Sequence, residues 1–356
     1  MTVVGVEILG EWILPSRTSF GGTEIGGLSS ITYDDGRGVY YALSDDQGDR
    51  ETGDPVRYYT LTIEPSDGSF NEAGLTFLGV SQLWDDAKSA FAPGGVDPEG
   101  FTISRGGSFF LSSEGDLDGD PIVDPFIRRY NPSGTPTAEL PIPDHYIPDG
   151  TDRGVRFNLS FESLNLTPDG RRLVTAAEGA LSQDGPASAF GIGSLARILE
   201  YDLSHRSPVA EYVYEVGPWA EPSDIFGVNG IVEVLPIDNV GTMLVMERSF
   251  SVGGVGGNGT GNVVVLKQIS TAGATNVLDV DALYDGGSPI AFTPVSQSEV
   301  FAFDDTRVPV DNLEGMTFGP MLPDGRRTLV IISDNNFSSA QFTQFFVLAV
   351  DIQPAS

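Results

Sequence analysis

The chain has 356 residues, 40% of them hydrophobic, and its 50 acidic residues outnumber 19 Lys and Arg residues to give a formal net charge of −31. So few bases cannot neutralise a phosphate backbone, which argues against a nucleic-acid partner. The chain has no cysteine and two histidines, so disulfides, thiolate chemistry, a His-rich zinc site and a His-based triad are all disfavoured. The sequence also lacks a run of about 18 apolar residues that would span a membrane.

A hairpin pattern recurs five times along the chain, at intervals of roughly 60 to 85 residues. Each repeat has a polar or acidic residue, a short alternating strand, a turn that is mostly rich in Asp and Gly, and a second apolar strand that ends in acids or amides. Turns of this composition between alternating runs predict β-hairpins. The repeats cover residues 26–47, 96–116, 160–180, 226–249 and 311–338.

Most repeats continue into a further strand, which predicts sheets of three to four strands. Sheets of this size repeated at this spacing predict an all-β protein with a β-propeller fold, as one domain over residues 1–356. Five blades are visible, and we predict six. The sixth would come from residues 263–303, or from residues 3–14 closing with the C-terminal strand. A two-sheet sandwich is the alternative, although it explains the short strands and not the repeated motif.

The polar residues at the start and the end of each hairpin are expected to be neighbours, because antiparallel strands bring these positions together. The expected pairs are Glu99 with Glu114, Glu162 with Glu178, Asn229 with Glu247, and Glu314 with Asp334. Equivalent blades would gather these pairs at one end of the molecule, around a channel mouth. The first repeat has Ser29 and Ser30 in place of a leading acid. The predicted ring is therefore uneven, which favours a site with one preferred side.

Such clustered acids repel one another unless some are protonated or a base or cation lies among them. Hard oxygen ligands without His or Cys favour Ca²⁺, which accepts six to eight oxygens in loose geometry. The predicted ligands of a Ca²⁺ site are Glu99, Glu162, Asn229, Glu314, Asp334 and Asn335. The alternative is that these side chains bind loop amides without a metal. A separate run, Asp116, Asp118 and Asp120, resembles the start of a calcium loop or forms a solvated turn.

Several segments resemble the phytase-like propeller family, which is described as having esterase-like activity of phytase. They read "GGLSSITYD", "DPEGFTI", "FESLNLTPDG", "VMERSF" and "NLEGMTFGPMLPDGRRTLVIISDNNF", and the resemblance covers nearly the whole chain. It implies a propeller, usually exported, with a calcium-dependent phosphoesterase or esterase activity. The acids that match the family by position are Glu99, Glu162, Glu314 and Asp334, with Glu178, Glu247 and Arg248 at the trailing ends. Only two lysines, Lys88 and Lys267, are present.

These observations predict a calcium-dependent hydrolase of a small phosphate or other ester. In this mechanism Glu178 or Glu247 is the general base, and Arg248 stabilises developing negative charge. Two other functions stay open: a non-catalytic, calcium-stabilised propeller that binds a partner, and a lactonase-like hydrolase. We expect a monomer that is periplasmic or secreted, with its export signal removed. His145 is expected to be a surface loop residue.

Overall fold

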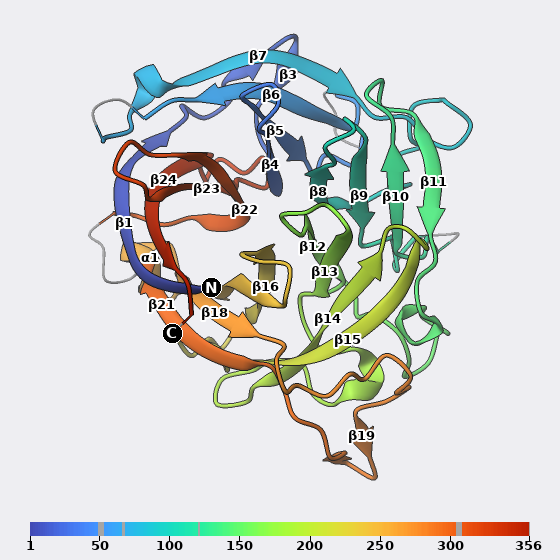
Figure 1. Cartoon of the computed structure of the whole chain (residues 1–356). Coiled ribbons are helices and arrows are strands. Elements are labelled where there is room, and N and C mark those ends of the chain that lie inside the picture. Colours follow the sequence, from blue (N-terminus) through green and yellow to red (C-terminus); the bar gives the residue numbers. More distant parts are fainter. Residues whose placement is uncertain (49–52, 66–67, 120–121, 304–307, 356) are drawn as a thin grey trace. The chain divides into compact units, whose positions relative to one another are not determined.

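The computed structural model describes residues 1–48, 53–65, 68–119, 122–303 and 308–355. Five four-stranded sheets account for most of the regular structure in these ranges (Figure 1). The prediction of an all-β propeller is confirmed, with five blades in place of the predicted six. The described residues contain one short α-helix, α1 (Gly256–Gly259), and three turns of 3-10 helix at Glu72–Gly74, Asp144–Tyr146 and Ser182–Asp184. No helix among them is long and apolar enough to cross a membrane.

Contacts between Cα atoms divide the chain into two compact units. Unit 1 comprises Met1–Ser112, Arg128–Glu139 and Asp311–Ser356, and unit 2 comprises Ser113–Ile127 and Leu140–Val310. The prediction of a single domain over residues 1–356 stays a prediction.

Unit 1 holds three of the sheets, the second of them nearly complete. The first consists of β4 (Ser30–Asp34), β5 (Val39–Ser44), β6 (Arg57–Ile63) and β7 (Leu75–Gln82). The second consists of β8 (Pro98–Ile103), β9 (Phe109–Ser113), β10 (Phe126–Tyr130) and β11 (Pro136–Leu140). The third consists of β22 (Asn312–Met321), β23 (Arg327–Asp334), β24 (Gln344–Gln353) and β1 (Thr2–Ile13). A small hairpin is formed by β2 (Ser19–Phe20) and β3 (Thr23–Glu24).

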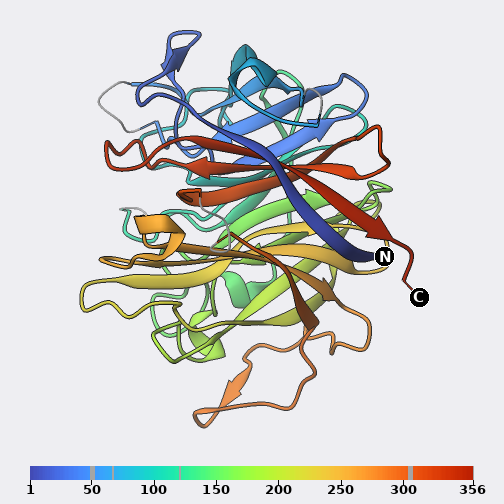
Figure 2. The same ribbon diagram turned by 90° about the vertical axis from the view of Figure 1, so that its left-hand side faces the viewer.

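Unit 2 holds the other two sheets. One consists of β12 (Phe161–Leu166), β13 (Arg172–Ala177), β14 (Ser194–Asp202) and β15 (Ser207–Val216). The other consists of β16 (Gly227–Pro236), β17 (Thr242–Ser251), β18 (Asn262–Ser270) and β21 (Ser296–Ala302). A hairpin of β19 (Tyr284–Asp285) and β20 (Ser288–Pro289) projects away from these two sheets (Figure 2).

The two segments proposed for a sixth blade instead complete existing sheets, so that prediction is wrong. The N-terminal strand β1 does pair with the C-terminal strand β24, from Thr2 opposite Gln353 to Ile13 opposite Gln344. It is, however, the fourth strand of the sheet that β22 begins, and Figure 1 shows the two strands side by side. Likewise, β18 and β21 extend the β16–β17 hairpin. Each segment adds only one or two strands to a four-stranded sheet. These strands pair with the unpaired backbone N–H and C=O groups at the edge of a hairpin that is already present.

The five predicted hairpins are β4–β5, β8–β9, β12–β13, β16–β17 and β22–β23. Several of their turns depend on glycine: Gly170 has a φ of 71° and Gly325 a φ of 89°, values that glycine adopts without steric cost. Within unit 1 the first strand β4 contacts the first strands β8 and β22, and within unit 2 β12 contacts β16. Contacts between the first strands of different hairpins bury the side chains of these strands. In β22, for example, the first eight residues are all buried. The start of every first strand is therefore a crowded position.

Candidate functional site

In unit 1, acidic side chains from the hairpin ends gather around Asp45, the residue that follows β5. Its Oδ1 atom is buried and accepts no hydrogen bond from the residues that the structure describes. Burial and the negative charge of Asp334, Glu314, Asp97 and Asp46 raise the pKa of Asp45 well above its ordinary value. An uncompensated carboxylate in this position favours either a bound proton or a bound cation.

Glu314 reaches this cluster through a β-bulge. The register of β22 against β23 shifts between Leu313 and Gly315, so that Glu314 is the extra residue of its strand. Asn312 then donates one amide hydrogen bond to Glu314 (2.8 Å) and a weaker one to Asp334 (3.3 Å). Bulges of this kind re-aim a side chain and are frequent beside active sites. The predicted neighbours Glu314 and Asp334 are thus joined by a shared amide, Asn312.

The backbone beside Asp45 is held by Asn335, which was predicted as a cation ligand. Its Oδ1 accepts hydrogen bonds from the amides of Gly27 and Phe337, both at 3.0 Å. These two bonds use both lone pairs of the oxygen in fixing the chain. Gly27 has a φ of 59°, and a Cβ added to it would lie 1.9 Å from Asp45 Oδ1. Glycine is therefore required at position 27 for the backbone to pass this close to the carboxylate.

In unit 2, the corresponding position after β13 is occupied by Glu178, which is almost fully buried. Its Oε1 lies 3.5 Å from Arg248 Nη2, and both side chains are at most 9% exposed. The Glu178 carbonyl accepts from the amide of Ile231 (3.0 Å), which ties it to β16. A Cβ on Gly230 would come within 2.3 Å of Glu178 Cγ, so the glycine permits this approach. Glu178 and Arg248 form a buried ion pair on two adjacent hairpins.

Glu247 lies nearby in β17, and its carboxylate is saturated with hydrogen bonds. Oε2 accepts from the Tyr214 hydroxyl (2.6 Å) and from Lys267 Nζ (2.7 Å). Oε1 accepts from Asn229 Nδ2 (2.9 Å) and from the Gly217 amide (3.2 Å). Burial and the Glu247 charge together raise the pKa of Tyr214 well above its ordinary value. Asn229 and Glu247 are the predicted neighbours, but Asn229 points its amide nitrogen, not its oxygen, at the carboxylate.

The other predicted acids have mixed environments. Glu114 accepts a short hydrogen bond from the Ser160 amide, which holds the start of the next hairpin. Glu162 occupies a register shift between Phe161 and Ser163, the same kind of bulge position as Glu314. Glu99 lies half-buried in β8 of unit 1. Glu162 and Glu314 are thus equivalent side chains in two different sheets.

The predicted ligand set is divided between the units. Glu99, Glu314, Asp334 and Asn335 belong to unit 1, and Glu162 and Asn229 belong to unit 2 together with Glu178, Glu247 and Arg248. The single ring of acids therefore stays a prediction. Within the described ranges, no group of three or more Asp, Glu or His side chains is already arranged to hold a metal ion. In the acidic run, Asp116 accepts from the Asp118 amide (3.1 Å), as in a turn, and Asp120 lies outside the described residues.

The sequence-based prediction missed Asp45 and Asp97. Asp45 ends the second strand of the first repeat, which is the position that Glu114, Glu178, Glu247 and Asp334 hold in the other repeats. Asp97 precedes the leading acid Glu99 in "VDPEG". The repeat pattern itself contained the signal for Asp45, because the trailing position of the first repeat is also acidic.

His145 is not on the surface, which corrects the prediction. It is 5% exposed, and its Nε2 lies 3.1 Å from Glu211 Oε1. Glu211 also accepts from Tyr146 (2.5 Å) and from Arg197 (2.6 Å), and Arg197 pairs with Asp184 through two further hydrogen bonds. The loop is buried because these charged groups satisfy one another.

Comparisons with known proteins agree with the fold. The model of the phytase-like family, described as "Esterase-like activity of phytase", matches residues 23–337. An uncharacterized secreted protein of Arthroderma benhamiae is 24% identical over 188 residues, which are 44% of this chain and 35% of the relative. The match therefore spans about a third of that relative's length.

The solved structures that the chain matches include an α-L-arabinofuranosidase from Lactobacillus brevis. It has a TM-score of 0.46 at 13% identity, and the match covers 91% of each chain. An endo-1,4-β-xylanase from Bacteroides thetaiotaomicron has a TM-score of 0.44 at 11% identity, covering 92% of this chain and 95% of that one. Likeness of this degree says nothing about activity.

Proposed function

Because the chain belongs to the phytase-like family, described by its esterase-like activity, we propose that it is a calcium-dependent hydrolase of small phosphate or other esters. The observation that carries this proposal is the buried Asp45 Oδ1, which has no hydrogen-bond partner in the described part of the chain and is exposed to the charge of four other carboxylates. A divalent cation would neutralise this charge.

The donor chemistry of the cluster fits a hard cation. Carboxylate oxygens without His or Cys are the ligands that Ca²⁺ prefers. We assign the role of cation ligands to Asp45, Asp97, Glu314 and Asp334. Asn335 is better assigned to fixing the loop, since its oxygen already accepts two amides. When bound, Ca²⁺ supplies a positive charge that polarises a phosphoryl or carbonyl oxygen.

Of the two predicted general bases, Glu178 is the better candidate. Glu247 accepts four hydrogen bonds, one of them from a lysine, so both of its carboxylate oxygens already have donors. Glu178 Oε1 lies 3.5 Å from Arg248 Nη2, a longer contact than the 2.7 Å between Glu247 Oε2 and Lys267 Nζ. For unit 2 we propose that Glu178 acts as the base that takes a proton from the attacking water, and that its partner Arg248 stabilises the negative charge that develops on the substrate.

A non-catalytic propeller is the second candidate. It is favoured by the observation that Glu114, Glu247 and Asn335 hold loop amides and neighbouring side chains, as purely structural polar groups do. In that case Ca²⁺ at Asp45 would stabilise the blades, and the protein would bind a partner without turnover.

The test combines thermal melting with hydrolysis assays. Melting with Ca²⁺ and with EGTA is followed in the wild type, in Asp45→Asn and in the control Asp169→Asn, whose side chain lies in a hairpin turn and is 34% exposed. Hydrolysis of p-nitrophenyl phosphate, p-nitrophenyl acetate, phytate and a panel of lactones is measured in parallel. We expect Ca²⁺ to raise the melting temperature of the wild type and the control but not of Asp45→Asn, and Glu178→Gln to abolish turnover while keeping the Ca²⁺ effect.

Two results would count against these assignments. A Ca²⁺-dependent melting temperature without turnover of any substrate would favour the binding module. Turnover that survives in Glu178→Gln would remove Glu178 as the base. We also propose that the protein acts outside the cytoplasm and as a monomer. The first proposal is supported by the secreted relative, and light scattering of the purified chain tests the second.

A further inference from the structure

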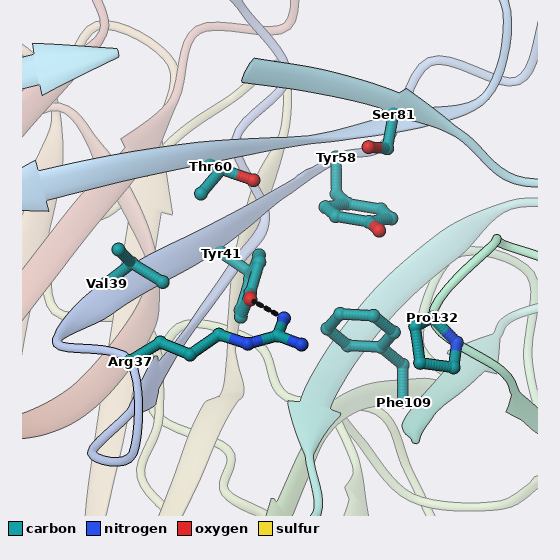
Figure 3. A pocket seen from close by; sticks show the side chains of 8 residues that line it. All are labelled: Arg37, Val39, Tyr41, Tyr58, Thr60, Ser81, Phe109 and Pro132. Atoms are coloured by element: carbon teal, nitrogen blue, oxygen red, sulfur yellow. Dashed lines mark hydrogen bonds between the residues drawn. The ribbon is translucent and has the colours of Figure 1, made fainter. Parts of the chain in front are cut away.

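A pocket in unit 1 lies on the face of the first sheet that points away from the β1–β24 side. Tyr40, Ala42, Tyr59 and Leu61 pack in the core with residues of β24, such as Phe345. Because side chains alternate along a strand, Tyr41, Tyr58 and Thr60 point the other way. With Ser81 of β7 and Phe109 of β9 they line a cavity of about 340 Å³ (Figure 3). This volume is at the lower end of the range for small-molecule sites.

The pocket is separate from the acidic cluster. Tyr41 and Asp45 lie four residues apart along the same strand and its end, which is about 13 Å at the usual rise per residue. Arg37, in the β4–β5 turn, is at the opposite end of the hairpin from Asp45. A ligand in this pocket would therefore not contact the proposed hydrolytic residues of unit 1.

Arg37 gives the pocket a cationic group that is only partly committed. Its Nη1 donates to the Tyr41 hydroxyl (2.9 Å), and its Nε lies 3.7 Å from Asp34. Nη2 has no acceptor among the residues that the structure describes, and the side chain is 60% exposed. Figure 3 shows the guanidinium extending into the space between Tyr41 and Phe109. The Tyr41 bond thus fixes Arg37 while leaving donors available to an anion.

The remaining lining combines flat apolar surface with hydroxyl groups. Three aromatic rings, Tyr41, Tyr58 and Phe109, meet at centroid distances of 5.0 to 5.7 Å. Aromatic rings present apolar faces, and the hydroxyls of Tyr41, Tyr58, Thr60 and Ser81 each donate and accept hydrogen bonds. These features suit a ring with apolar C–H groups on its face and hydroxyls at its edge.

We propose that this pocket binds a sugar acid, a pyranose ring bearing one carboxylate, with Arg37 as the carboxylate partner. Arginine and carboxylate form short, charge-assisted hydrogen bonds. A polyphosphate fits less well, because Arg37 is the one cation that lines the described pocket and Asp34 lies beside it. This site goes beyond the proposed hydrolase function and does not depend on it.

The test is calorimetric titration of D-glucuronate and D-glucose into the full chain, with EGTA present. Using the Glu178→Gln protein in parallel separates binding here from any turnover. We expect glucuronate to bind at least about tenfold more tightly than glucose, since a hydrogen bond to a charged group typically contributes a free energy equivalent to about a tenfold change in affinity or more. Arg37→Met should remove this preference, and Arg37→Lys, which keeps the charge without the planar fork, should retain part of it.

Arg171→Met is the matched control, because Arg171 is also an arginine in a hairpin turn, is 86% exposed, and does not line this pocket. It should bind glucuronate like the wild type. Three outcomes would overturn the proposal: equal affinity for glucose and glucuronate, glucuronate binding that Arg37→Met leaves intact, or no binding of glucuronate at about 10 mM. Tighter binding of inositol hexakisphosphate that Arg37→Met abolishes would also overturn the assignment to a sugar acid.

Discussion

Replacing Arg197 with methionine should be among the most destabilising single changes in unit 2. The Arg197 side chain and its partners Asp184 and Glu211 are all fully buried. Arg197 donates to Asp184 at 2.5 and 2.9 Å, to Glu211 at 2.6 Å and to the Val280 carbonyl at 3.0 Å. The methionine fills much of the same volume but leaves two buried carboxylates without their counter-charge.

The expected magnitude follows from what the carboxylates retain. In the variant, Asp184 still accepts a hydrogen bond from the Leu283 amide (2.8 Å), and Glu211 still has Tyr146 and His145 as hydrogen-bond partners. An amide and a phenol hydroxyl do not replace the Arg197 cation in an apolar interior. Removing one partner of a buried ion pair typically costs about 3–5 kcal/mol. We therefore expect Arg197→Met to lower the free energy of unfolding by about 3–5 kcal/mol.

The assay is urea unfolding followed by circular dichroism, with Arg153→Met as the matched control. Arg153 also pairs with an aspartate, Asp281, through two hydrogen bonds, but the side chains are 33% and 65% exposed. Exposed pairs contribute less than about 1 kcal/mol. If the two variants lose the same stability, burial is not what makes the Arg197 pair important, and the reasoning is refuted.

Three further predictions concern the acidic positions. The folded state raises the pKa of Asp45, so without Ca²⁺ its contribution to the free energy of unfolding is complete below the ordinary Asp pKa and is lost as pH rises through the folded pKa. In EGTA the melting temperature should therefore fall over this pH range, and Asp45→Asn should make the fall smaller. Gly27→Ala should lower the free energy of unfolding in urea by at least about 1–3 kcal/mol, because of its positive φ and the contact with Asp45; an unchanged urea midpoint would contradict the close approach. Lys267→Met should lower the free energy of unfolding by about 2 kcal/mol in the same assay, a value between those of exposed and fully buried ion pairs. Adding Glu247→Gln to the Lys267→Met variant should restore part of this stability, because it removes the carboxylate that lost its partner.

The sequence predicted the features that depend on neighbouring residues. Asp–Gly turns between alternating runs located the hairpins, and antiparallel pairing brought Asn229 to Glu247 and Glu314 to the vicinity of Asp334. The blade count was wrong because it depends on how distant strands join. A segment of 25 residues separates β18 from β21, yet the two pair with each other.

Features set by distant contacts were not predictable from local pattern. The loop sequence around His145 predicts a surface position, because nothing near it in the sequence indicates a buried partner. That partner, Glu211, is 66 residues away in the sequence. The four hydrogen bonds to Glu247 could not be anticipated either, since Lys267 reaches it from the neighbouring strand β18 and Tyr214 from β15, which belongs to the other sheet of unit 2. The hydrophobic pattern of strands such as β15 and β18 indicates that they are buried, but it does not indicate which of their side chains contact one another.

The pairing of β1 with β24 has a consequence for the order in which the protein folds. The two strands join residues 2–13 to residues 344–353, so the sheet cannot acquire its outermost strand until residues 344–353 have left the ribosome. Contacts so distant along the chain carry a large loop-closure entropy and slow the final assembly step. Until then the edge of β24 or of β1 is open to another chain, which makes this sheet the place where a chaperone or a misfolded neighbour would act first.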